Sequence, residues 1–187
     1  PTIAENTRRF QTVHGEDIPI GLHPAIRSEE ACYRSTALAV ELARRCGTRL
    51  HVLHLSTAKE LTLLSAKPLE DKRITAEACV HHLLFSERDY EEKGNLIKCN
   101  PAIKTEQDRR QLLAALAAGK IDVVATDHAP HTLDEKDQPY LKAPSGLPLV
   151  QHALVSLLEH VHDRAMSLEQ VVEYLRVLEE VGWVEIR

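Results

Sequence analysis

The stretch DVVATDHAPH, residues 122–131, decides how the rest of the sequence is interpreted, because a short apolar run there stops in an acid and two histidines. Val123 and Ala125 follow the period-two pattern of a strand, and Asp127 continues the same face. In α/β proteins the carboxyl ends of parallel strands carry the binding and catalytic groups, because the loops there vary while the strands hold them rigidly. We therefore expect the Asp127 carboxylate at the rim of a parallel sheet, directed at a functional site.

Strand and helix patterns alternate on both sides of this stretch, which predicts an α/β fold with a parallel sheet, either flat or closed into a barrel. The expected strands are residues 49–56, 73–80 and 121–127. The expected helices are residues 1–14, 29–46, 105–118, 149–162 and 167–178, with a further helix opening at Thr57 and Glu60. Residues 18–24 look extended, and the loop over residues 128–148 is long enough to be a candidate active-site loop.

Local end signals support two of these helices. Ser28 is a favourable N-cap for the helix at 29–46, and Gly47 follows it as a left-handed terminator. Thr105 and Asp108 form the sequence pattern of a capping box at the start of the helix at 105–118. One face of the helix at 29–46 is expected to be buried, formed by the stripe Ala31, Ser35, Leu38, Leu42 and Cys46.

The composition, with 43% hydrophobic and 27% charged residues in a chain of 187, is that of a globular domain. The formal net charge of -5 gives no electrostatic reason to expect nucleic acid or an anionic membrane, so a small molecule is the expected partner. We see no apolar run of about 18 residues and no signal peptide, and no nucleotide-binding or serine-hydrolase motif. The cysteines lack a C-x-x-C spacing, which indicates reduced thiols in a cytoplasmic protein: Cys32, Cys46, Cys79 and Cys99.

The residue types at two strand ends suggest metal chemistry. His54 closes its strand much as Asp127 closes its own, and imidazole and carboxylate are ligands that zinc uses, with one position left open for water. By strand alternation, His54 shares a face with Leu50 and Val52. His51 then points to the opposite face, so His51 and His54 are not expected to bind one metal together.

Each candidate residue also has a simpler explanation. Asp127 is a good helix N-cap for the loop that follows, and His54 alone is as well explained as a buried, hydrogen-bonded histidine. His131 can equally be explained as a solvated side chain of the loop. Asn100 can be explained as part of an Asn-Pro turn. A structural role is favoured for the adjacent histidines of the apolar segment CVHHLLF, His81 and His82.

Four motifs then follow one another along the chain: LHVLHLSTAKE at 50–60, ITAEACVHHL at 74–83, IKCNPAIKTEQDR at 97–109 and VVATDHAPHTLDEK at 123–136. In that order and at those separations they resemble the second half of a dihydroorotase of the bacterial class I type. This is a cyclic amidohydrolase of the amidohydrolase superfamily. The resemblance covers residues 1 to about 176, and the tail at residues 177–187 does not match the family.

The resemblance implies roughly the second half of a TIM-like (β/α)8 barrel, with one or two zinc ions at the carboxyl end of the strands. The implied reaction is the reversible conversion of N-carbamoyl-aspartate into dihydroorotate in pyrimidine biosynthesis. His54 is similar to a zinc ligand after the sixth strand. Asp127 matches the aspartate that touches the metal after the eighth strand and, as general base, passes a proton to the departing ring nitrogen. The positions that match substrate-binding residues are Asn100, His131 and Gly146, the last in a segment that closes over the ring.

The chain also departs from the family pattern. The H-x-H pair of the first strand, the bridging acid or carboxylated lysine of the fourth and the small C-terminal β domain have no counterpart, and the fifth-strand histidine would fall before Pro1. We therefore expect weak or absent zinc binding, an inactive isolated chain, and association through open sheet edges, as in a homodimer. The alternatives are an allantoinase or dihydropyrimidinase, a non-catalytic scaffold supporting a partner such as aspartate transcarbamoylase, and a self-contained α/β binding domain.

Overall fold

The computed structural model describes residues 1–180, which form an α/β fold around a three-stranded parallel sheet in the order β1-β2-β3. β1 (Leu50–Val52) pairs with β2 (Ile74–Cys79), which pairs in turn with β3 (Val123–Ala125). The prediction of a parallel sheet in an alternating α/β chain is confirmed. The tail predicted at residues 177–187 lies outside the described residues from position 181 onward.

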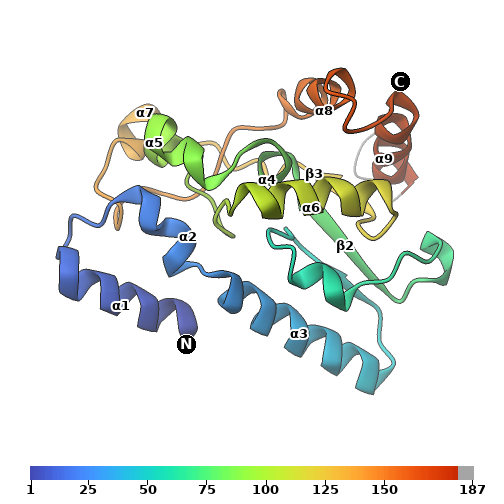
Figure 1. The fold of residues 1–187 in the computed structure, drawn as a ribbon, viewed down its shortest axis with the longest axis horizontal. Coiled ribbons are helices and arrows are strands. Elements are labelled where there is room, and N and C mark those ends of the chain that lie inside the picture. Colours follow the sequence, from blue (N-terminus) through green and yellow to red (C-terminus); the bar gives the residue numbers. More distant parts are fainter. Residues whose placement is uncertain (181–187) are drawn as a thin grey trace.

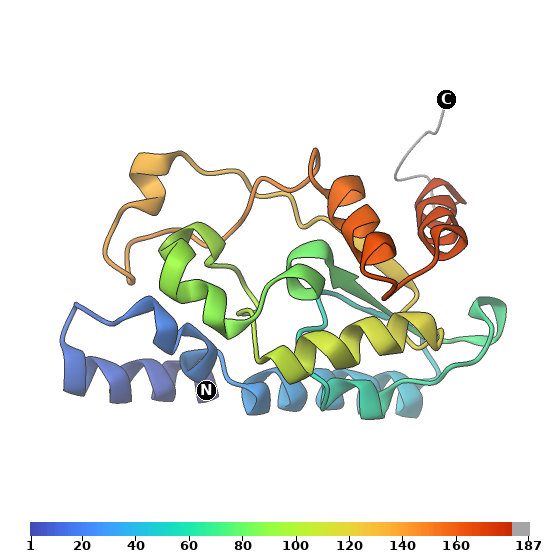
Figure 2. The ribbon, with the colours of Figure 1, turned by 45° about the horizontal axis from the view of Figure 1, so that its top comes forward.

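Helices surround the sheet, and in both ribbon views α3 runs below α6 while α8 lies above it (Figures 1 and 2). The helices are α1 (Thr2–His14), α2 (His23–Ile26), α3 (Glu29–Cys46), α4 (Val80–Leu84), α5 (Tyr90–Lys93), α6 (Glu106–Ala117), α7 (Leu133–Lys136), α8 (Ala153–His162) and α9 (Leu168–Glu180). Short 3-10 helices are η1 (Ile20–Leu22), η2 (Glu60–Leu63), η3 (Leu69–Asp71), η4 (Glu87–Asp89) and η5 (Gly94–Ile97). Within the described part of the chain, no helix has the length and apolar character needed to cross a membrane.

The predicted end signals of α3 and α6 are confirmed. Ser28 Oγ accepts the Ala31 amide at 3.3 Å, and α3 ends at Gly47, which is left-handed with φ 62°. At the start of α6, the Asp108 amide donates to Thr105 Oγ1 at 3.1 Å, while the Asp108 carboxylate accepts the Thr105 amide at 3.2 Å. The apolar face of α6 is buried, and it consists of Leu112, Leu113 and Leu116.

Other local predictions were wrong in extent or type. Only the start of the segment at 18–24 is extended, at Pro19, because η1 begins at Ile20 and runs into α2. Pro24 is tolerated in the first turn of α2, where its missing amide costs no intrahelical bond. The helix predicted after Thr57 is only the 3-10 turn η2. β1 and β3 each stop two residues before His54 and Asp127, because both residues have a positive φ and leave the extended conformation.

The buried face of α3 is also not the predicted one. Leu38 is 58% exposed and Leu42 47% exposed. The Thr36 hydroxyl instead donates to the buried Glu60 Oε1 at 2.6 Å, and this long-range polar contact keeps the Thr36 face turned inward. The buried residues of α3 are Thr36, Val40 and Ala43.

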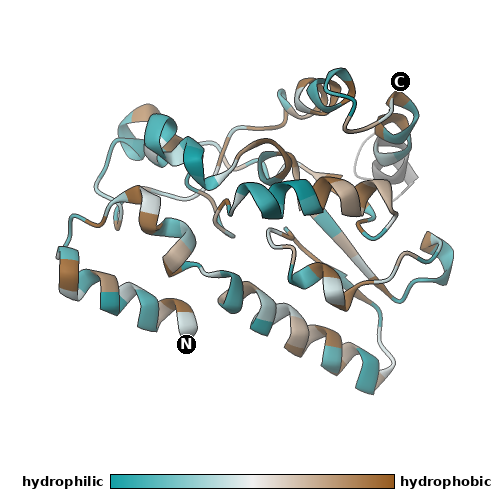
Figure 3. Ribbon diagram, in the orientation of Figure 1, coloured by the Kyte–Doolittle hydropathy of each residue, from teal (hydrophilic) through white to brown (hydrophobic). Residues whose placement is uncertain are grey.

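Alternation along β2 separates a helix-covered face from a polar face. Ala76 and Ala78 are fully buried in the main core, together with Leu112 of α6. Figure 3 shows that α6 is hydrophilic towards its start and more hydrophobic towards its end, where the leucines contribute to this core. Glu77 and Cys79 occupy the other face of β2. This polar face is the one available to the candidate site.

A buried ion pair fixes the start of β3 against β2. Lys72 Nζ lies 2.5 Å from Asp122 Oδ1, and both side chains are almost fully buried. Asp122 Oδ2 accepts the Ala76 amide at 2.9 Å, and Lys72 Nζ also donates to the Gly119 carbonyl at 2.6 Å. Burial of both charges is tolerated because each is paired and further hydrogen-bonded.

A second, smaller core contains Ile18, Ile26 and Tyr140, and the fully buried His23 stacks edge-on against Tyr140 there. His23 Nε2 lies 2.7 Å from the Cys99 carbonyl oxygen, and Nδ1 lies 2.8 Å from the Tyr140 hydroxyl. A carbonyl only accepts, so Nε2 carries the proton and Nδ1 accepts from the hydroxyl. Burial lowers the pKa of His23 to about 3, so the imidazole is neutral in the fold.

We expect His23 to make the fold sensitive to acid. Its folded pKa of about 3 lies below the ordinary 6.5, so the unfolded chain binds a proton first, and stability present above pH 6.5 is lost as the pH falls towards 3. This residue alone should cost up to about 1.4 kcal/mol per pH unit in that window. Urea unfolding of the wild type and His23→Gln at pH 7 and pH 5 measures the difference. Equal pH slopes for the two chains would contradict the assignment.

Candidate active site

The centre of the polar face is Glu77, whose side chain is 1% exposed. Glu77 Oε1 lies 2.7 Å from His54 Nδ1, and Oε2 lies 3.2 Å from His51 Nε2. His51 is held from its other side by a 2.8 Å contact between Nδ1 and Thr75 Oγ1. One buried carboxylate therefore orients two imidazoles.

The structure corrects the prediction that His51 and His54 point to opposite faces. Leu50 and Val52 pack towards the main core, while His51 and His54 both contact Glu77 on the polar face. The alternation fails because β1 ends at Val52 and His54 adopts φ 55°. Strand geometry therefore cannot be extended to a residue in the left-handed region.

The free nitrogen of His54 faces Asp127, although β1 and β3, which precede these two residues, are separated by β2 in the sheet. A carboxylate only accepts, so His54 Nδ1 carries the proton towards Glu77, and the Nε2 lone pair faces Asp127. Nε2 lies 3.6 Å from Asp127 Oδ1, which is too long for a hydrogen bond. Two ligands of one tetrahedral zinc ion lie about 3.4 Å apart. A histidine backed by a carboxylate is also the usual form of a metal-binding imidazole. These two donors therefore fit a zinc ion.

The backbone at both positions is held in an unusual conformation. Among residues 1–180, the non-glycine residues with positive φ are His54 at 55°, Asp127 at 44° and Arg164 at 59°. Such conformations cost free energy and persist where the surrounding structure enforces them, typically at functional sites. Two of these three residues face each other here, which points to a functional reason for the strain.

The charges reinforce the orientation of His54. Burial by itself would raise the pKa of Glu77, but the hydrogen bonds from His51 and His54 outweigh burial and bring the pKa to about 2. Glu77 is thus anionic. The hydrogen bond to Glu77 raises the pKa of His54; burial opposes the shift, and the charge of Asp127 adds to it. Protons therefore compete with a metal for His54 as the pH falls.

The predicted substrate-binding residues lie in two places. His131 Nε2 contacts the Ser145 carbonyl at 3.3 Å, and a Cβ on Gly146 would lie 3.1 Å from the same nitrogen, so His131 and Gly146 are neighbours. The Gly146 amide donates to the Lys98 carbonyl at 2.9 Å, which brings the segment before Asn100 to this loop. Asn100 itself is exposed.

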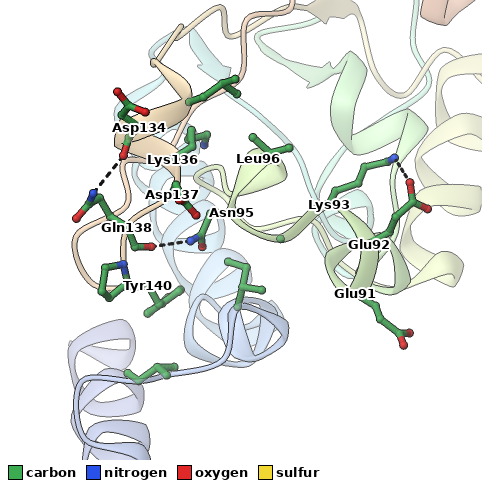
Figure 4. Close-up of a pocket in the computed structure, with 15 residues that line it drawn as sticks. Glu91, Glu92, Lys93, Asn95, Leu96, Asp134, Lys136, Asp137, Gln138 and Tyr140 are labelled. Carbon is green, nitrogen blue, oxygen red and sulfur yellow. Dashed lines mark hydrogen bonds and ion pairs between the residues drawn. The ribbon is translucent and has the colours of Figure 1, made fainter.

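A hollow of about 580 Å³ lies between the segment at 91–96 and the segment at 133–140, away from the His54–Asp127 pair. Figure 4 shows its two walls, joined where Asn95 Nδ2 donates to the Gln138 carbonyl at 2.8 Å. No predicted site residue lines it. The hollow therefore does not identify the active site, whose two candidate metal donors are each only about a quarter to a third exposed.

Sequence reasoning missed Glu77, although a signal was present. An acid in the middle of the strand ITAEAC is costly to bury unless it is paired. That cost predicts a partner across the sheet, and the neighbouring strand offers two histidines. Cys79 was missed as well, although its Sγ lies 3.1 Å from His54 Nδ1.

Comparison with known proteins gives partial matches. The dihydroorotase of Halobacterium salinarum is 37% identical over 168 residues, covering 90% of this chain and 39% of that protein. The dihydroorotase of Anaplasma phagocytophilum is 40% identical over 129 residues, covering 69% of this chain and 29% of that protein. The crystal structure of dihydropyrimidinase from Brevibacillus agri superposes with a TM-score of 0.85 at 22% identity, over 97% of this chain and 41% of that one, which shows the fold alone. No protein-family model matches.

The parallel sheet and the superposition define the fold class, which is part of a parallel α/β barrel like that of the dihydropyrimidinase chain. Within that class, the chain is homologous to one part of the dihydroorotases, at 37% identity over most of its length. The predicted resemblance and the partial barrel are both confirmed. The chain spans about two fifths or less of the length of these relatives.

Glu77→Gln should lower the pKa of His54, because the largest cause of its elevation is the hydrogen bond to the Glu77 carboxylate. Zinc affinity should also fall, by about 10- to 100-fold, since His54 loses the group that fixes its tautomer. The measurement is an NMR titration of the imidazole nitrogens, followed by zinc titration. Glu91→Gln, at an exposed acid lining the distant hollow, is the matched control. An unchanged His54 pKa in Glu77→Gln would contradict the assigned contact.

Gly146→Ala should destabilise the fold by about 1–3 kcal/mol, because Gly146 has φ 147° and a Cβ there would lie 2.6 Å from both Cβ and O of Ala129. Denaturant unfolding provides the measurement. Gly21→Ala is the control, since a Cβ at Gly21 meets nothing within 4 Å. Equal stability of the two variants would show that the 146 loop is not held against Ala129.

Proposed function

We propose that this chain supplies part of the active site of a zinc-dependent dihydroorotase, which interconverts N-carbamoyl-aspartate and dihydroorotate in pyrimidine biosynthesis. The observation that carries the proposal is the pairing of His54 Nε2 with the Asp127 carboxylate at 3.6 Å, with Glu77 behind His54. Homology to dihydroorotases over most of the chain supports the choice of substrate class. The spacing of the four cysteines supports a reducing, cytoplasmic location.

His54 and Asp127 would hold the zinc ion in this site. A bound zinc ion would polarise the amide carbonyl and would lower the pKa of water enough for it to ionise near neutral pH. Asp127 is positioned as the general base: its carboxylate faces the ligand nitrogen of His54 and is partly exposed, so it can accept a proton and pass it to the departing ring nitrogen. Glu77 is a positioning residue, because it acts only through the histidines that it orients.

The substrate side of the site is proposed from the resemblance and from the loop geometry. His131 and Gly146 lie together, and the Gly146 amide is tied to the Lys98 carbonyl just before Asn100. His131 Nε2 is 3.3 Å from the Ser145 carbonyl oxygen, and Nδ1 lies 3.9 Å from Glu135 Oε2, which is beyond hydrogen-bond distance. We assign Asn100, His131 and Gly146 to substrate binding. Because Gly146 has no side chain, the loop at 128–148 can approach the ring of the substrate closely.

The donor set within residues 1–180 explains why the chain should act as part of a larger assembly. Catalytic zinc sites use about three protein ligands, and the His54–Asp127 pair supplies two. The outer strands β1 and β3 each leave one edge without a strand partner in the described sheet. Open edges favour association, either with a second copy or with further barrel strands.

A half-barrel complementation assay tests the proposal. The chain is assayed for dihydroorotate hydrolysis alone and mixed with the part of the Halobacterium salinarum dihydroorotase that it does not match, both with zinc. We expect no more than a trace of turnover alone and measurable turnover in the mixture. Asp127→Asn should lower the rate of the mixture by about 10²- to 10⁴-fold, the range for a lost acid–base group. Asp134→Asn, at an exposed acid of the same loop, should not.

The outcomes separate the alternatives. Turnover of the mixture that is insensitive to Asp127→Asn would contradict the assigned base. Faster hydrolysis of allantoin or dihydrouracil than of dihydroorotate would favour another cyclic amidohydrolase, which the dihydropyrimidinase-like fold also fits. Zinc bound in the mixture without any turnover would favour the non-catalytic scaffold.

A further inference from the structure

A second group of donor side chains lies buried beside the candidate active site. Cys79 ends β2, and His81 and His82 lie in the first turn of α4. Cys79 Sγ and one ring nitrogen of each histidine all lie within 4.8 Å of one another. The three residues are 0%, 1% and 3% exposed. Two imidazoles and a thiol thus converge at a point shielded from water.

The histidines lack the hydrogen bonds that buried rings need. Within residues 1–180, neither nitrogen of His81 has a partner, and His82 Nδ1 has none. His82 Nε2 contacts the Pro101 carbonyl at 3.0 Å, so Nε2 carries the proton and the unpartnered Nδ1 carries a lone pair. Leaving a buried polar atom unsatisfied destabilises the fold, so such an atom calls for a partner that is a water or an ion.

The protonation state of both rings suits metal binding. Burial lowers the pKa of His81 to about 3 and lowers the pKa of His82 as well, so both imidazoles are neutral near pH 7. A metal ligand must be deprotonated at the coordinating atom. A structural role for both histidines, as the apolar sequence context suggests, is satisfied at His82 by the Pro101 contact but leaves His81 without an explanation.

We propose that Cys79, His81 and His82 form a binding site for a soft d10 metal ion, specifically Cu⁺. Thiolate and imidazole are ligands that this ion accepts. One thiolate and two neutral imidazoles balance a single positive charge. On binding, the sulfur–metal bond forms as the S–H bond breaks, and the proton passes to solvent.

This site is distinct from the His54–Asp127 pair but adjoins it through Cys79. Cys79 Sγ also lies within 4.8 Å of ligand atoms of His54 and Glu77, so a competing group, His54–Glu77–Cys79, exists on the other side of the thiol. His54 Nδ1 and both Glu77 oxygens are already hydrogen-bonded to each other or to His51, whereas His81 is not bonded. The group formed by Cys79, His81 and His82 is therefore the better metal site.

The test measures Cu⁺ binding by competition with a Cu⁺ chelator in anaerobic buffer, in a Cys46→Ser background that removes the exposed thiol. We expect one Cu⁺ per chain and a rise in Tm on loading. His81→Leu should weaken binding by more than about tenfold, equivalent to the loss of 1.4 kcal/mol. Without metal, His81→Leu should be as stable as the parent or more so, since it removes an unsatisfied buried group. His54→Ala should keep the affinity.

Several outcomes would overturn the proposal. These are no Cu⁺ binding by the parent chain, Zn²⁺ bound more tightly than Cu⁺, or weaker binding in His54→Ala but not in His81→Leu, which would place the ion in the competing group. Cys79→Ser provides a second variant of nearly unchanged volume, and it should abolish the ultraviolet thiolate-to-copper absorption band. Retention of that band would exclude Cys79 as a ligand.

Discussion

The buried carboxylate of Glu77 is the constraint on which the rest of the site depends. It lies in the middle of the central strand, is 1% exposed, and is paired with His51 of β1 and with His54, which follows β1. An unpaired charge at that position would cost several kcal/mol, so the two strands must stay in the register that brings the histidines to it. The same contact fixes the tautomer of His54 and leaves its other nitrogen facing Asp127. Sheet register and the orientation of His54 therefore rest on one interaction.

The strained residues at the strand ends are held in place by the packing beneath them. His54 and Asp127 both have a positive φ, and each follows a strand whose inner side chains lie in the main core. The ion pair between Lys72 and Asp122 fixes the opposite end of β3, so the strand cannot slide to relieve the strain at Asp127. The rigid sheet thus holds His54 and Asp127 close together in unfavourable backbone conformations. Such strain is typical of preorganised functional sites.

Two donor groups of opposite character lie at the carboxyl end of the sheet. The His54–Asp127 pair is partly exposed, and His54 is oriented by a charged partner, which suits a site that must exchange substrate and protons with solvent. The Cys79–His81–His82 group is almost fully buried and has unpaired ring nitrogens, which suits a tightly held ion and no substrate. Glu77, which orients His54, and Cys79 share one face of β2, and α4 begins directly after Cys79, so the two groups adjoin at the thiol.

The sequence by itself determined the parallel α/β class, the capped helices α3 and α6, and the meeting of His54 with Asp127, because periodicity, capping residues and strand ends are local signals. It also determined the dihydroorotase resemblance through four ordered motifs. It did not determine which face of α3 is buried, since Thr36 turns inward to meet Glu60, which is distant in the chain. Nor did it show that His51 and His54 share a face or that Glu77 joins them. Those features arise from a left-handed residue after β1 and from a charge paired across strands, and both are decided by tertiary packing, which overrides alternation along a single strand.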